Sequence, residues 1–82
     1  MNGWQDEVKK VLRPLLMCSV EQRYQLFMST EFGKKVVDYL DLQGSVRNVM
    51  ENVIKFLSKV TDSEKEFLAE FSKLPKPEWY KE

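Results

Sequence analysis

Apolar residues recur along most of the chain at intervals of three and four positions, which is the spacing of one face of an α-helix. A sustained alternation of apolar and polar residues, the pattern of a half-buried strand, is absent. Only three Gly and three Pro interrupt the chain. The pattern therefore predicts an all-α fold, a compact bundle of about five short helices.

The first predicted helix covers residues 4–17, and its pattern contains a proline. Asp6 and Glu7 lie in its first turn, where the helix dipole favours negative charge. Pro14 removes one helical hydrogen bond and crowds the carbonyl four residues earlier. We therefore expect either a stop near Leu12 or a kink, with Pro14 opening a short second piece.

The second and third helices are predicted from their start signals. Ser19 and Gln22 have the spacing of a capping box, in which each residue satisfies an exposed backbone N–H of the other. The second helix is therefore expected to run from Ser19 to position 29 or 30. A short third helix is expected over residues 32–40, although Gly33 is a weak helix former.

The fourth helix has the clearest signal. Apolar residues keep the three-and-four spacing for about four turns between positions 46 and 60. Ser45 is placed to cap its N-terminus, and Gly44 before it suits a turn whose backbone angles other residues avoid. We expect this helix to be the central element of the bundle.

The last helix is predicted to reach about position 74. Thr61 and Glu64 have capping-box spacing, and Ser63 and Glu66 are an overlapping alternative. Two prolines then end the helix and favour an extended tail.

The chain is expected to divide into a helical domain and a tail. We predict that residues 1–74 form the helical domain and that residues 75–82 are a Pro-rich tail or the start of a linker. Trp79 and Tyr80 in this tail have three possible roles: folding back over the bundle, docking into a partner, or leading into a linker.

Composition excludes several classes of function. Thirteen Lys and Arg balance thirteen Asp and Glu, so no global field attracts a polyanion and a nucleic-acid binder is not expected. No apolar run approaches the ~20 residues of a membrane span, and the N-terminus lacks a secretory pattern. We expect a cytoplasmic protein that contacts neither nucleic acid nor membrane.

The chain has few of the residues that are typical of catalytic sites. The chain has no His and a single cysteine, Cys18, so it has no internal disulfide, no zinc cluster and no histidine base. We interpret Cys18 as a structural thiol and the carboxylates of the last helix as solvated surface. We therefore predict a protein that is not an enzyme and that uses no cofactor or metal.

Three methionines at apolar positions are assigned to the core rather than to a binding groove: Met17, Met28 and Met50.

The charged residues gather in small patches whose signs differ. Two basic patches lie near the front and middle of the chain, and an acidic one lies on the last helix. Opposite charges on different faces would orient the domain on a related helical domain or on a second copy of itself, and the alternative is an ordinary mixed surface. The candidate partner contacts are Lys9, Lys10, Arg13, Lys34, Lys35, Arg47, Glu64, Glu66 and Glu70.

Residues 32–54 carry a family resemblance. In this stretch a short amphipathic helix leads through Gly44-Ser45 to a helix that contains Asn48. With the helices before and after it, the order and spacing over residues 5–74 resemble the effector-associated domains, small death-domain-like adaptor modules of bacterial immune and signalling systems.

The resemblance implies an adaptor function. Modules of that family sit at the ends of larger proteins and are thought to join a sensor to an effector by like-with-like contacts. By resemblance, this chain would act through homotypic or paired heterotypic helix-bundle contacts, and Gly44, Ser45 and Asn48 would be architectural, shaping the turn and the cap. Two alternatives stay open: a small phage- or plasmid-borne inhibitor of a host enzyme, and a helix-turn-helix nucleic-acid binder over residues 39–57.

Overall fold

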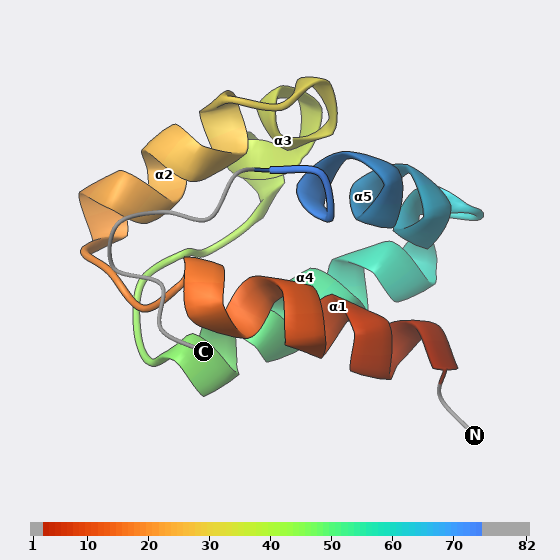
Figure 1. The fold of residues 1–82 in the computed structure, drawn as a ribbon, viewed down its shortest axis with the longest axis horizontal. Coiled ribbons are helices and arrows are strands. Elements are labelled where there is room, and N and C mark those ends of the chain that lie inside the picture. Colours follow the sequence, from red (N-terminus) through yellow and green to blue (C-terminus); the bar gives the residue numbers. More distant parts are fainter. Residues whose placement is uncertain (1–2, 75–82) are drawn as a thin grey trace.

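Five α-helices and one short 3₁₀ turn make up residues 3–74, the part of the chain that the computed structural model describes (Figure 1). The prediction of an all-α bundle of about five short helices is confirmed. The expected tail, with Trp79 and Tyr80, lies outside the described residues. In chain order the elements are α1 (Gly3–Leu15), α2 (Val20–Met28), α3 (Glu31–Val36), η1 (Val37–Tyr39), α4 (Val46–Lys59) and α5 (Ser63–Phe71).

Helix α1 continues through its proline. The expected stop near Leu12 is wrong, because Pro14 lies in the last turn and the missing N–H affects a single bond of the helix. Helical bonding resumes after the proline, since the N–H of Leu16 donates to the carbonyl of Leu12 at 2.9 Å. Burial of Val8, Leu12 and Leu15 along one face holds the helix against the core.

Local capping signals set the starts of α2 and α4. The Gln22 N–H donates to Ser19 Oγ at 3.2 Å, and the Ser19 N–H donates to Gln22 Oε1 at 3.1 Å, so the predicted capping box is present. Ser45 is the N-cap of α4, and its Oγ accepts the N–H of Asn48 at 3.1 Å. Gly44 before it has a φ of 97°, a backbone angle that glycine adopts without strain.

The predicted third helix is divided into α3 and the 3₁₀ turn η1. It begins one residue early, because Thr30 caps it by accepting the N–H of Gly33 at 2.8 Å. Gly33 is buried, and a Cβ atom there would overlap the carbonyl oxygen of Phe27. The glycine therefore permits the close approach of α3 to the end of α2. Tyr39, the last residue of η1, is 75% exposed.

The start of α5 differs from both predicted capping boxes. Its N-cap is Asp62, which has a φ of 63° and makes no side-chain cap bond. The left-handed turn directs the Ser63 hydroxyl back towards α4, where it is shared between the carbonyls of Leu57 at 3.0 Å and Val60 at 2.8 Å. This serine therefore satisfies the end of α4 rather than the start of α5. The helix also ends earlier than predicted, at Phe71.

Aromatic side chains from α2, α3 and α5 fill the centre of the bundle. The rings of Phe67 and Phe71 stack with centroids 4.4 Å apart, and Phe27 packs against Phe71 at 5.0 Å. All three side chains are fully buried. Helix α5 also packs against α1, α3 and α4, so its aromatic residues lie at the centre of the core.

The methionine assignment is correct for only one of three residues. Met50 is 4% exposed, whereas Met17 is 62% and Met28 is 49% exposed. Met17 follows the end of α1, where the helical register no longer applies. Met28 is the last residue of α2, next to Phe27, which faces the core.

A buried arginine joins two connecting segments at one end of the bundle. Arg23 is only 6% exposed. Its Nε donates to the carbonyl of Leu16 at 2.9 Å, and its Nη1 donates to the carbonyls of Leu42 and Gly44, each at 2.8 Å. Arg23 therefore fixes the chain that follows α1 beside the chain that precedes α4.

Candidate functional site

The nine charged residues predicted as partner contacts do not form one surface. Three of them, from α1 and α4, line one groove: Lys9, Arg13 and Arg47. Four lie on α3 and α5, which pack against each other: Lys34, Lys35, Glu66 and Glu70. Of the other two, Lys10 lines a hollow with Leu74, and Glu64 lies in the first turn of α5.

Opposite charges meet where α3 packs against α5. Lys35 Nζ lies 3.9 Å from Glu66 Oε1, and both carboxylate oxygens of Glu70 lie 3.2 Å from the backbone N–H of Phe32, which donates to them. The expected segregation of these basic and acidic patches onto different faces is therefore wrong. Periodicity places a charge on a face of its own helix, but it does not show which helices adjoin.

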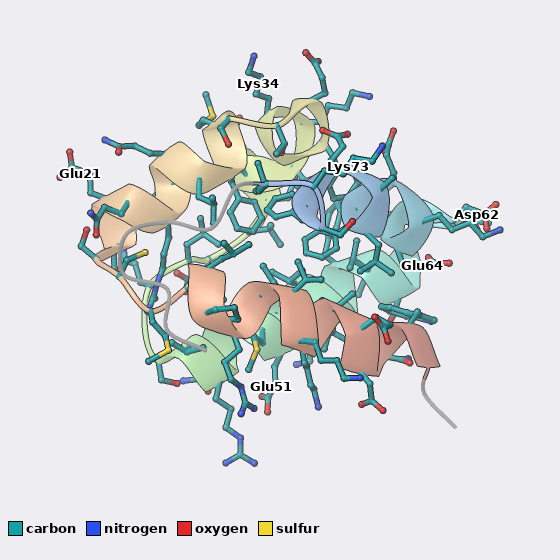
Figure 2. All side chains as sticks on the ribbon, in the orientation of Figure 1. Glu21, Lys34, Glu51, Asp62, Glu64 and Lys73 are labelled. Atoms are coloured by element: carbon teal, nitrogen blue, oxygen red, sulfur yellow. The ribbon has the colours of Figure 1, made fainter. Side chains whose placement is uncertain are left out.

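Helices α1 and α4 pack side by side (Figure 1). A groove runs between them. It consists of two adjoining hollows that share Arg13, Arg47 and Met50. Figure 2 shows Glu51 at this edge of the molecule and Lys34 at the opposite edge. We call it the α1/α4 groove, and its lining residues are Lys9, Arg13, Met17, Val46, Arg47, Met50 and Glu51.

Helical spacing explains how these side chains come together on α1. Lys9 and Arg13 are four residues apart and therefore share a face of the helix. Met17 follows after four more residues, just beyond the helix end. The bonds of Arg23 to the carbonyls of Leu16 and Gly44 hold this end of the groove next to the start of α4.

The contribution of α4 is both apolar and charged. Val46 and Met50 lie one turn apart and form an apolar row, in which Met50 is buried and Val46 half-buried. Arg47 and Glu51 form the next row and approach to 3.8 Å, Nε to Oε1. Together with the exposed Met17, this gives an apolar strip edged by charged side chains.

The charges of the α1/α4 groove do not balance. Among residues 3–74, three cations and one carboxylate line it, and Glu51 is paired with Arg47. Within residues 3–74, Lys9 and Arg13 form no ion pair, whereas the neighbouring Lys10 pairs with Glu7 outside the groove at 3.9 Å. The groove therefore carries a local positive charge although the whole chain is neutral.

A second hollow, of about 580 Å³, lies between α3 and the turn that joins α4 to α5. Two ion pairs contribute to its rim: Lys35 with Glu66 at 3.9 Å and Lys65 with Asp62 at 3.6 Å. Because these charges are matched, the hollow has no net charge with which to select a partner. Its apolar lining comes from Phe32, Val36, Phe56 and Val60.

Cys18 lies half-buried in the turn after α1. Its Sγ donates to the carbonyl of Leu15 at 3.4 Å. Burial raises the pKa of the Cys18 thiol, and the Arg23 guanidinium nearby opposes that rise without cancelling it. A raised pKa reduces the thiolate fraction near neutral pH, which agrees with the interpretation of Cys18 as a structural thiol.

No family model, curated protein or solved structure matches the chain. None of the helices in residues 3–74 has the length and apolar character needed to cross a membrane. In the same residues, no group of three or more His, Cys, Asp or Glu is arranged to hold a metal ion.

Sequence reasoning missed two features of the site. Arg23 was not singled out, because a cation on an amphipathic helix is usually solvated, and no local signal distinguishes the buried one. Met17 was assigned to the core, although its position after Pro14, near a predicted helix end, was a signal that the periodic face stops there.

Proposed function

We propose that the chain is a protein–protein interaction adaptor of the death-like, effector-associated class, which couples a sensor to an effector in the cytoplasm. Its binding surface is the α1/α4 groove, and its contacts are homotypic or paired heterotypic contacts between helical domains. The observation that carries the proposal is the convergence of Lys9, Arg13 and Arg47, from two helices, around an apolar strip that includes the exposed Met17.

The chemistry of the groove favours a protein partner over a nucleic acid. Contacts to a phosphate backbone use many cations and gain little from an apolar strip. Here three cations surround Met17, Val46 and Met50, and one of the three is paired with Glu51. A mixture of apolar area with a charged rim is typical of protein interfaces.

The groove also has the rigidity that an adaptor surface needs. Its two walls are α1 and α4, which pack on the same core through Leu12 and Val49. Arg23 fixes the loops at one end of it. A preorganised surface binds with a smaller entropic cost, because few side chains and no loops must be ordered.

Size-exclusion chromatography with light scattering tests this proposal. The full chain is analysed alone and mixed with helical domains encoded by neighbouring genes, at low salt and high protein concentration. We expect a complex or a dimer that the double variant Arg13→Glu/Arg47→Glu weakens by about tenfold or more, because it reverses the charge of the groove.

The matched control is Lys34→Glu/Lys73→Glu, which changes the net charge equally at exposed positions outside the groove. This control should leave the complex intact. A chain that stays monomeric and binds none of these domains, or a complex that both double variants weaken equally, would contradict the proposal.

A further inference from the structure

The α1/α4 groove has the chemistry of a receptor for one class of protein segment. We infer that the partner inserts an acidic amphipathic helix, with its carboxylates over Lys9, Arg13 and Arg47 and its apolar side chains on Met17, Val46 and Met50. The inference rests on the proposed function and narrows it to a heterotypic contact.

The charge of the groove selects an acidic segment. Lys9 and Arg13 form no ion pair within the described residues, and the one carboxylate of the groove, Glu51, is already held by Arg47 at 3.8 Å. A basic segment would add like charge to this surface, whereas a segment with two or three carboxylates would neutralise it.

The apolar strip requires that the segment also carry apolar side chains. Met17 is 62% exposed and lies beside the half-buried Val46 and the buried Met50. Methionine has a flexible, polarizable side chain that adapts to an incoming apolar group. An acidic segment without apolar residues would leave this strip exposed to water.

The spacing of the wall residues matches a helix. Lys9 and Arg13 are four residues apart on α1, and Val46 and Met50 are four residues apart on α4. Four residues of a helix advance by about 6 Å, so a bound helix presents side chains at positions i and i+4 at the interval of its receptors. Amphipathic helices that dock in grooves use this repeat.

Helix α5, which carries the acidic patch of the sequence, does not supply this segment from a second copy of the chain. Two of its three carboxylates are engaged, since Glu66 pairs with Lys35 and Glu70 accepts the N–H of Phe32. The apolar residues of the same helix, Phe67 and Phe71, are buried in the core. Within the described residues, α5 therefore presents one carboxylate without an ion pair, Glu64, and no exposed aromatic side chain, and we assign the acidic helix to a different protein.

NMR spectroscopy of the full chain with ¹³C-methyl-labelled methionine tests the inference. The probes are three capped peptides of about 14 residues, long enough for roughly four turns. The first is an amphipathic helix of Leu and Glu. The second has the same Leu positions with Lys in place of Glu, and the third is a scramble of the first without an apolar face.

The expected result is that only the first peptide shifts the Met17 and Met50 methyl signals, while Met28, exposed on α2 outside the groove, serves as the unshifted reference. Added salt and the variant Arg13→Glu/Arg47→Glu should each weaken this binding, the variant by about tenfold or more. The Lys34→Glu/Lys73→Glu control should bind as the original chain does.

Five results would overturn the inference. The first two are binding of the Lys peptide or of the scrambled peptide as tight as that of the first peptide. The third is the absence of any shift of the Met17 and Met50 methyl signals at about 1 mM of the first peptide. The fourth is a shift of these two signals with protein concentration alone, which would identify a second copy as the occupant. A fifth is a shift of the Met17 signal caused by Trp79→Ala/Tyr80→Ala without peptide, which would identify the chain's own tail. If the peptide fails while a complex sensitive to Arg13→Glu/Arg47→Glu persists, this inference is wrong and the proposed function stands.

Discussion

At the scale of single residues, the molecule depends on a few polar side chains that close its turns. Arg23 donates to three backbone carbonyls, and Ser63 is shared between two carbonyls at the end of α4. The carbonyls of Leu16 and Val60 also accept a backbone N–H. At the other carbonyls, loss of the side-chain donor at a buried or half-buried position costs more than the bond itself contributes. The polar residues therefore determine how the helices connect, while the apolar residues determine which faces pack.

Replacement of Arg23 by Met should destabilise the fold by about 3 kcal/mol, because it removes three hydrogen bonds to backbone carbonyls. Urea unfolding followed by circular dichroism measures the loss. The matched control is Arg13→Met, which should change the free energy of unfolding by less than about 0.5 kcal/mol because Arg13 is exposed. Equal losses of unfolding free energy for the two substitutions would show that Arg23 does not stabilise the fold by joining the chain after α1 to the chain before α4.

The thiol of Cys18 should be less reactive in the folded chain than in the unfolded chain. Burial raises its pKa, so at a pH near or just below the ordinary cysteine value a smaller fraction is thiolate in the folded state. Alkylation by iodoacetamide, followed by mass spectrometry against pH, should show a midpoint at higher pH in buffer than in urea. A midpoint lower in buffer than in urea would indicate an activated cysteine.

At the scale of the elements, predictions from the sequence are correct where the signal is local. The Ser19–Gln22 capping box and the long stripe of α4 each act within one helix, so both are visible in the chain. The start of α5 at Asp62 is set instead by the fit of Ser63 against α4. The approach of α3 to α2 at Gly33 is likewise a tertiary contact, which no local pattern shows.

Replacement of Gly33 by Ala should destabilise the fold by at least about 2 kcal/mol, although alanine is the better helix former. The reason is that the added Cβ would overlap the Phe27 carbonyl, a backbone atom, and would force α3 away from α2. Gly3→Ala is the matched control, because nothing lies within 4 Å of a Cβ there, and it should be neutral or slightly stabilising. Thermal unfolding compares the two, and a stable Gly33→Ala variant would contradict this role of the glycine.

At the scale of the whole molecule, the neutral charge of the sequence conceals an uneven surface. The sequence identified Lys9, Arg13 and Arg47 as candidates, but their convergence depends on α1 and α4 packing side by side. From the sequence, Lys35 and Glu66 belong to separate patches, but the packing of α3 against α5 brings them together. One basic groove thus remains where several patches were expected, and we propose that the partner binds in this groove.

Site-specific photo-crosslinking tests that placement most directly. A benzophenone amino acid replaces Met17, in the α1/α4 groove, or Met28, exposed on α2, and each full-length variant is irradiated with the purified partner domain found by chromatography. We predict a covalent complex from position 17 and none from position 28. A crosslink from position 28 alone, or from neither position while the complex forms in solution, would contradict the assignment of the groove as the binding surface.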